Sequence, residues 1–427
     1  MLRKLLHIFS DTQLLIIAAL LPLYCMVISI KLLWVILHAA KDYFDVFILY
    51  EGGFGHTIMQ SDVYLRYIAP KGLVIVMTTP GRHNHRINLL FGDKMITLSR
   101  GALGKKISSL DAWFLWRADK FIAKQLGRIN KFIAREIHDV DSLITFAINK
   151  GYGYLGRHKS IERLWYEVAP TRHFSNVSKE SLETWADWQE FRQITASEES
   201  FREWLNDEEV VAFYIRNKGT KEDAPHNFLR SGKKLTDYLL VFEHLKTLGY
   251  RILIYGELDE NEYLYLKERN LNVVSFRDSP FEKETWDLFA GKFAKFVVGN
   301  NGGGLTIPIL FGKKILVLDS FVFNHSVPFS LMSYKLVFHD GTPVSPDQFF
   351  FHNPLLLNEA REYQVLEQSP GTDLDILKEF LACFNFWPTN DPFTARMHSL
   401  CGLSYTPGAL VSRVYLKSAG LVVKPLC

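Results

Sequence analysis

Short apolar runs alternate with helical stretches along the second half of the chain. The strand-like runs are 210–215, 252–255, 273–276, 296–298 and 315–318, and the stretches 235–248, 261–269, 283–291 and 305–311 have helical character. Such alternation predicts an α/β fold, with a parallel sheet covered by helices on both faces. Because ligands of these sheets bind beyond the carboxyl ends of the strands, the informative loops begin at Arg216, Gly256, Arg277 and Gly299.

The first half shows a weaker pattern of the same kind. Strands are predicted at Val46–Tyr50, Leu73–Met77 and Met95–Leu98. Apolar positions then recur at helical spacing, with lysines and arginines on the opposite face: Ile122, Leu126, Ile129, Ile133 and Ile137. This stripe predicts a surface helix packed on the core, and contact with anionic lipid is the alternative. The polar region 151–209, rich in Trp and Glu, is predicted to be a helical connection.

An apolar segment near the N-terminus predicts membrane association. No charged residue occurs from Leu14 to Ile30, and after Lys31 the apolar character continues to Ala40. The length is near the lower limit for a spanning helix, and Pro22 could bend it. A single span and a re-entrant or interfacial hairpin therefore both remain open, whereas the long apolar region argues against a cleaved signal peptide.

Composition narrows the class of protein. The 427 residues are 48% hydrophobic and 22% charged, enough for a large core in two domains. A net charge of +3 is too small to indicate nucleic-acid binding. The four cysteines lie far apart without metal-ligand spacing, so the sequence predicts neither a zinc site nor a disulfide framework and favours a reducing compartment.

The strand predicted at 296–298 runs into a glycine-rich turn before the next helix. The turn comprises Asn300, Asn301, Gly302, Gly303 and Gly304. Glycines let the backbone approach a ligand closely, and the first amides of the following helix favour an anion, so this turn is a candidate diphosphate site. The alternative is a tight turn without a ligand.

Other strand ends carry side chains that could bind a nucleotide. Arg216 directly follows an apolar strand and could offer paired donors to phosphate oxygens, or it could pair with a carboxylate at the sheet rim. Arg277 and Asp278 could bind a base or ribose, although Asp278 before Pro280 could instead stabilise a turn.

The first half contains a second glycine loop with candidate general bases. Gly52, Gly53 and Gly55 follow a predicted strand and precede a predicted helix at 57–67. Glu51 and His56 flank them, and either could take a proton from an acceptor hydroxyl, with Asp62 a weaker candidate. Either residue could instead cap the helix.

Metal chemistry has little support in the sequence. Asp139 with Asp141 and Asp373 with Asp375 have paired-carboxylate spacing, but neither pair ends an apolar strand. The second pair is predicted to form the acidic first turn of a helix. We therefore expect no bound metal.

Together these motifs resemble a known enzyme group. They are the Gly53–His56 loop, the strand ending at Arg216, the segment from Asp237 to Gly256, and the turn from Phe296 to Gly304. Over residues 45–355 the chain is similar to bacterial glycosyltransferases of surface-polysaccharide gene clusters. More remotely it resembles the fucosyltransferase-type members of the GT-B superfamily.

The resemblance implies a GT-B enzyme with two Rossmann-like domains facing each other across a cleft. Its expected parts are a membrane anchor (1–44), an acceptor-side domain (45–205), a nucleotide-sugar domain (206–355) and a helical region returning to the N-terminal domain (356–427). It implies metal-independent, inverting transfer from a nucleoside-diphosphate sugar to a glycan or lipid-linked acceptor, without a cofactor or nucleic acid. Arg216 would contact the donor diphosphate and Glu51 would act as base.

The anchor and the resemblance together place the enzyme at the cytoplasmic face of a bacterial inner membrane. Two other readings stay open. A sugar-nucleotide epimerase uses the same architecture without an acceptor, and a membrane-tethered assembly protein could keep the fold without activity.

Overall fold

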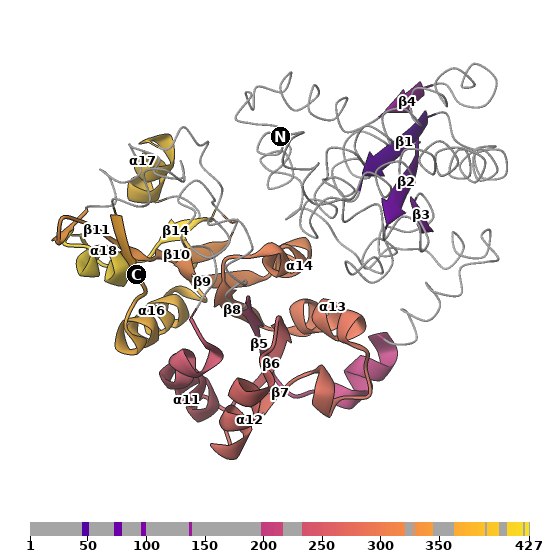
Figure 1. Cartoon of the computed structure of the whole chain (residues 1–427), viewed down its shortest axis with the longest axis horizontal. Coiled ribbons are helices and arrows are strands. Elements are labelled where there is room, and N and C mark those ends of the chain that lie inside the picture. Colours follow the sequence, from indigo (N-terminus) through magenta and orange to yellow (C-terminus); the bar gives the residue numbers. More distant parts are fainter. Residues whose placement is uncertain are drawn as a thin grey trace, which may run out of the picture. The chain divides into compact units, whose positions relative to one another are not determined.

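The structure is a computed structural model, and it divides into two compact units (Figure 1). One unit comprises Met1–Val168 and Ser175–Phe191, and the other comprises Ala169–Phe174 and Arg192–Cys427. The described residues are 198–216, 233–320, 327, 329–344, 363–388, 391–400, 408–421 and 423–426, together with the backbone of four strands in the first unit. Each unit is described by itself below.

The four described strands of the first unit form a parallel sheet in the order β3-β2-β1-β4. β1 (Asp45–Tyr50), β2 (Gly72–Thr78) and β3 (Met95–Ser99) confirm the three predicted strands. The prediction of a helical stripe was wrong at its last residue. Ile137 lies in a strand, β4 (Glu136–His138), and pairs with Val46 of β1. Apolar residues three or four positions apart suit a helix, but β-branched isoleucines also favour strands, so spacing alone did not locate this boundary.

The second unit is built on a seven-stranded sheet in the order β14-β10-β9-β8-β5-β6-β7. All paired neighbours are parallel. The strands are β5 (Val210–Ile215), β6 (Arg251–Gly256), β7 (Val273–Val274), β8 (Phe296–Asn300), β9 (Lys314–Ser320), β10 (Ser330–Tyr334) and β14 (Leu410–Val411). The predicted parallel α/β fold is thus confirmed for this unit.

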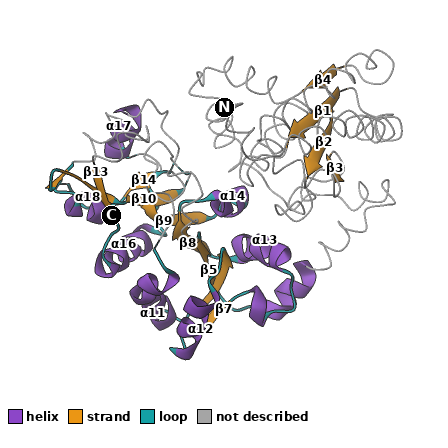
Figure 2. Cartoon of the chain, in the orientation of Figure 1, coloured by secondary structure: helices purple, strands orange, loops and turns teal. Residues whose placement is uncertain are grey.

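Helices cover both faces of this sheet, as Figure 2 shows. α11 (Leu239–Thr247) packs against α16 (Pro370–Cys383), and α13 (Lys283–Phe293) packs against α14 (Thr306–Leu310). α12 (Glu260–Glu268) contacts the 3₁₀ helix η8 (Leu235–Tyr238). Two further 3₁₀ helices lie at strand ends, η9 (Phe276–Asp278) and η10 (Gly303–Leu305).

The remaining described elements lie towards the C-terminus. β11 (Leu336–His339) pairs antiparallel with both β12 (Thr342–Pro343) and β13 (Tyr363–Leu366). α17 (Pro392–Leu400) and α18 (Arg413–Ser418) flank β14. Since β14 pairs with β10, residues from the predicted C-terminal helical region contribute a strand to the seven-stranded sheet of the second unit. The predicted return to the N-terminal domain stays a prediction.

The core forms because both faces of the sheet are apolar. Every residue of β5 is buried, as expected for a strand covered on both sides. On one face Phe213 packs against Phe242 of α11, with ring centroids 4.7 Å apart. On the other, the fully buried Trp286 of α13 donates its indole N–H to the carbonyl oxygen of Ile254, 2.8 Å away. These contacts hold the strand ends in place.

The structure differs from the predictions in three respects. The predicted strand at 273–276 is shorter because Phe276–Asp278 turns into η9. β10 and β14 were not predicted, since Ser330 and Ser333 interrupt the apolar run of β10 and β14 is only two residues long. Cys383 is disulfide-bonded, contrary to the expectation of no disulfide, and the other three cysteines lie outside the described residues. Folding can bring distant cysteines within bonding distance.

No helix within the described ranges is long and apolar enough to cross a membrane. The predicted anchor at 1–44 lies outside those ranges.

Candidate functional site

The order of strands reverses beside β5. The chain passes from β5 outward to β6 and β7, and then returns to place β8 on the other side of β5. Ligands of open parallel sheets bind outside the carboxyl ends of the strands where the order reverses in this way. Here those ends carry Arg216, which follows β5, and the glycine bend Asn301–Gly304, which follows β8. Two parts of the predicted diphosphate site therefore share one edge of the sheet.

The side chain of Asn300 joins these two loops. Its Oδ1 accepts the backbone N–H of Arg216 at 2.9 Å, and its Nδ2 donates to the carbonyl oxygen of Arg216 at 3.2 Å. Asn300 is completely buried, at 0% exposure. We predicted Asn300 to contact a ligand, but the structure shows its amide bonded to both backbone groups of Arg216. It therefore fixes the backbone from which the guanidinium projects.

The glycine bend is occupied by an aromatic ring. A Cβ atom on Gly304 would lie 2.2 Å from Cε2 of Tyr214, and one on Gly302 would lie 2.4 Å from the Tyr214 hydroxyl oxygen. A Cβ on Gly256 would lie 2.8 Å from the same ring. We attributed these glycines to close approach of a ligand. The Tyr214 ring alone explains why positions 302 and 304 are glycine, because a side chain at either position would overlap it.

The backbone of the bend begins a helix. η10 starts at Gly303, Leu305 N–H donates to the carbonyl oxygen of Gly302 at 3.2 Å, and Thr306 Oγ1 donates to that of Gly303 at 2.6 Å. The hydroxyl of Tyr255 donates to the carbonyl oxygen of Gly304 at 3.2 Å. These bonds take up the carbonyl groups of the bend, while the first amides of a helix have no acceptor within it.

Charged groups lie close to the Tyr214 hydroxyl. Burial raises the pKa of Tyr214 to about 12, whereas a backbone hydrogen bond from Gly304 and the nearby guanidinium of Arg216 oppose that rise. Burial also raises the pKa of Asp287, whose carboxylate accepts from Lys283 Nζ at 2.6 Å and from the amide of Gly256 at 3.4 Å. The site therefore combines a cation, backbone donors and a carboxylate.

Arg277 and Asp278 lie at the end of the edge strand β7, two strands away from β5. Arg277 forms an ion pair with Glu260 at 2.8 Å. Asp278 accepts the backbone N–H of Ser275 at 3.3 Å and the hydroxyl of Tyr263. Asp278 thus stabilises the turn, which was the alternative reading of this residue, and a contact of either side chain with a nucleotide stays a prediction.

A buried charged triad beside the site was missed by the sequence analysis. Lys233 Nζ lies 2.7 Å from Oδ2 of Asp319 and forms a second ion pair with Asp373. All three side chains are at most 3% exposed. Asp319 is the penultimate residue of β9 and has a left-handed backbone (φ 51°), and the last residue of the strand, Ser320, accepts a hydrogen bond from Asn301 at 3.2 Å. A polar residue ending an apolar strand was the available signal. Asp373 does lie in the predicted acidic first turn of a helix.

The triad holds more negative than positive charge, so its protonation is perturbed. Burial, followed by the charge of Asp319, raises the pKa of Asp373 to about 8. Burial also raises the pKa of Asp319. Although burial favours the neutral amine, the two carboxylates raise the pKa of Lys233. At neutral pH the triad therefore carries one extra proton, held mainly by Asp373.

This proton predicts a pH-dependent stability. The ordinary pKa of aspartate is about 3.9, so between pH 4 and 8 the folded chain binds a proton that the unfolded chain releases. The stability that Asp373 contributes is fully present below the pKa of aspartate in the unfolded chain, and it is lost as pH rises through about 8. We expect the unfolding free energy to fall by at most about 1.4 kcal/mol per pH unit in that window.

Replacing Asp373 with asparagine should remove much of this slope, because the asparagine amide would keep the shape without titrating and Asp319 would then pair with Lys233 alone. Urea unfolding of both proteins between pH 5 and pH 8 measures the effect. Equal slopes for wild type and D373N would contradict the assignment of the proton.

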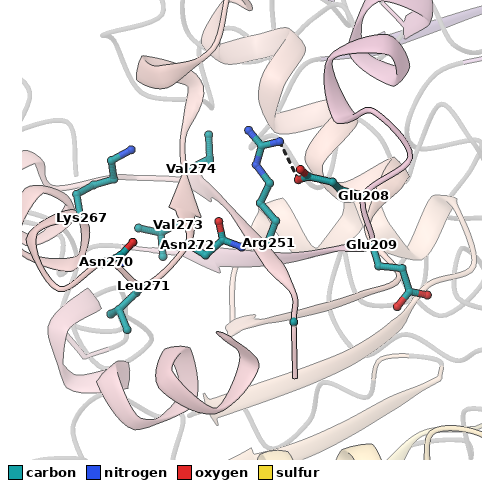
Figure 3. A pocket seen from close by; sticks show the side chains of 10 residues that line it. Glu208, Glu209, Arg251, Lys267, Asn270, Leu271, Asn272, Val273 and Val274 are labelled. Atoms are coloured by element: carbon teal, nitrogen blue, oxygen red, sulfur yellow. Dashed lines mark hydrogen bonds and ion pairs between the residues drawn. The ribbon is translucent and has the colours of Figure 1, made fainter. Parts of the chain in front are cut away.

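Two cavities lie away from this site, at the opposite edge of the same sheet. The larger, about 600 Å³, is lined by residues at the amino-terminal ends of β5, β6 and β7, among them Arg251, which pairs with Glu208 at 3.0 Å (Figure 3). The second, about 370 Å³, borders the start of β8. Neither cavity is lined by a residue predicted to bind the donor.

Several predicted residues lie outside the described residues. They are the candidate bases Glu51, His56 and Asp62, the first glycine loop, and the pair Asp139 and Asp141. Within the described residues, no three His, Cys, Asp or Glu side chains cluster so that they could hold a metal ion. The bases and the metal-free mechanism both stay predictions.

No protein-family model matches the chain, and no curated protein matches its sequence. Among solved structures it is similar to ADP-heptose lipopolysaccharide heptosyltransferase II of E. coli, with 11% identity, a TM-score of 0.40, and coverage of 74% of this chain and 99% of that one. E. coli heptosyltransferase WaaC with ADP has 13% identity, a TM-score of 0.36 and the same coverage. UDP-GlcNAc 2-epimerase from Neisseria meningitidis has 11% identity and a TM-score of 0.34, covering 88% of this chain and 96% of that one. At these scores we base the function on the residues of this chain alone.

Proposed function

We propose that this chain is a membrane-associated glycosyltransferase that moves a sugar from a nucleoside diphosphate to a hydroxyl of a glycan or lipid-linked acceptor. One observation supports the proposal most. Arg216 and the glycine bend follow neighbouring strands where the strand order reverses, and the side chain of Asn300 bonds to the backbone of Arg216. A guanidinium beside the first amides of a helix suits a diphosphate, which is the leaving group of such a transfer.

In the proposed reaction the chain stabilises the departing diphosphate and activates the acceptor hydroxyl. Arg216 and the amides of the bend at Gly302–Gly304 would stabilise the negative charge that builds on the departing diphosphate. Glu51 or His56 would take the proton of the acceptor hydroxyl as it attacks the sugar. We propose direct, inverting displacement without a metal ion, with Gly256, Arg277, Asp278 and Asn301 bordering the nucleotide.

The proposed setting is the cytoplasmic face of a bacterial inner membrane, in surface-polysaccharide synthesis. The apolar segment from Leu14 to Ala40 supports the membrane part of this proposal, because an enzyme acting on a soluble substrate has little use for such a segment.

Changing Arg216 to alanine is expected to weaken nucleotide-sugar binding about 10- to 100-fold, because charge-assisted hydrogen bonds contribute about 1.5–3 kcal/mol. R216K should recover only part of the affinity, since lysine keeps the charge but lacks the planar pair of donors. Calorimetry with a panel of nucleotide sugars, preselected by thermal stabilisation, measures both variants.

R251A is the matched control, because Arg251 lies at the opposite edge of the sheet and should leave donor binding unchanged. Normal donor binding and transfer by R216A would remove Arg216 from the leaving-group role. Free nucleoside diphosphate that appears only with an acceptor identifies a transferase. Turnover without an acceptor would instead identify an epimerase, and absence of any nucleotide-sugar binding would favour a non-catalytic assembly protein.

A further inference from the structure

Tyr214 connects the ends of three strands. Its ring, near the end of β5, stacks at a tilt against Tyr255 of β6, with centroids 5.2 Å apart. Cβ atoms on Gly302 and Gly304, which follow β8, would fall within 2.4 Å of the ring or its hydroxyl oxygen. Gly256 at the end of β6 meets the same ring and has a positive φ of 100°. One side chain therefore fills the space that these glycines leave open.

The Tyr214 hydroxyl also has a defined polar environment. A Cβ on Gly302 would fall 2.4 Å from its oxygen, so the hydroxyl lies against the bend. Burial raises its pKa, and the Gly304 backbone and the guanidinium of Arg216, two residues further along the chain, both lower it. The side chain is almost fully buried, with Tyr214 6% exposed. A buried hydroxyl in contact with one loop and close to the cation of another can fix the distance between them.

We propose that Tyr214 is the positioning residue of the diphosphate site: its ring sets the requirement for glycine at 302 and 304, and its hydroxyl holds the bend in register with Arg216. This inference rests on the proposed function, because the register matters only if an anion spans both groups. Tyr214 acts through Gly304 and Arg216, and is not itself required to touch the ligand.

The first test separates the hydroxyl from the ring. Y214F keeps the aromatic packing, so we expect a nearly unchanged melting temperature for the full chain. Because a typical hydrogen bond contributes about 1 kcal/mol, we expect about five-fold weaker binding of inorganic pyrophosphate, measured by calorimetry. If the hydroxyl merely competed for the Gly304 amide, Y214F would bind pyrophosphate as tightly as wild type or more tightly, and the proposal would fail.

The second test asks whether the ring explains the glycines. G304A should lower the melting temperature, because its methyl group would overlap the Tyr214 ring. Adding G304A to Y214A should lower the melting temperature by less than adding G304A to the wild type does. In the double variant the methyl group enters the space that the ring has vacated. Pyrophosphate affinity should stay low in the double variant. Recovery of full affinity, or purely additive melting shifts, would overturn the positioning role.

G371A is the matched control for adding a methyl group, because a Cβ on Gly371 would meet only Ser369 Oγ, at 3.9 Å. It should change neither pyrophosphate affinity nor melting temperature by much. The two proposals fail differently. Wild-type protein that binds neither pyrophosphate nor any nucleotide sugar would overturn the proposed function together with this inference. Wild-type binding that Y214F leaves unchanged would overturn only the role of Tyr214.

Discussion

Replacing Lys233 with methionine is expected to lower the unfolding free energy of the second unit by about 3–5 kcal/mol, because removing one partner of a buried ion pair leaves uncompensated charge. Lys233 is the cation paired with both Asp319 and Asp373, whose side chains are fully buried. Because the extra proton is already held mainly by Asp373, loss of Lys233 leaves Asp319 either to take up a second proton or to keep a buried charge without its cation. Urea unfolding, together with hydrogen exchange of the β9 amides, measures the loss in this unit.

The loss in K233M should be smaller at low pH, where protonation of both carboxylates relieves the unpaired charge. K295M is the matched control. Lys295 also pairs with a carboxylate, Glu209 at 3.1 Å, but the two side chains are 37% and 69% exposed. Exposed pairs contribute at most about 1 kcal/mol, so K295M should change little. Equal losses for the two variants would show that the triad is not the structural element inferred here.

Replacing Asn300 with alanine is expected to cost about 2–4 kcal/mol and also to weaken donor binding. Both backbone groups of Arg216 would lose their partner, and each unsatisfied buried polar group costs about 1–3 kcal/mol. The Arg216 side chain itself is left unchanged. A loss of nucleotide-sugar affinity in N300A would therefore reflect the position of the guanidinium, as calorimetry on the folded variant can measure.

The exposed Asn385 supplies the control, since N385A removes the same amide from the surface of this unit and should alter neither stability nor binding. R216A provides the contrast, because it removes the guanidinium itself and keeps the bonds of Asn300 to the backbone of residue 216. If N300A lost stability but bound the donor normally, Asn300 would have a structural role alone.

The triad and the proposed diphosphate site share one polar framework. Asn300 holds Arg216, and the adjacent Asn301 bonds to Ser320, which follows Asp319 of the triad. The framework thus links the ends of β5, β8 and β9. Hydrogen bonds of this kind couple the positions of the groups that they join. Changes in the triad should therefore be read out in donor affinity as well as in stability.

The sequence by itself determined the central strands of the second unit, the helices between them and the residues that follow those strands. Alternation of apolar runs with helical stretches depends only on local spacing, so β5, β6, β8 and β9 and the helices between them were predicted within a few residues. Arg216 and the glycine bend were recognised as strand-end residues for the same reason. β4 was misassigned and β10 missed because their short segments carry too little periodic signal.

Only the tertiary structure decided which strand ends meet. Arg216 and Asn300 are 84 residues apart, and their hydrogen bonds exist because the chain places β8 beside β5. Likewise, Lys233 meets Asp373 across 140 residues, and the glycines at 302 and 304 face a tyrosine from a different strand. The order of strands in a sheet follows from long-range packing of whole elements. Residue spacing records only what lies within a few turns of the chain.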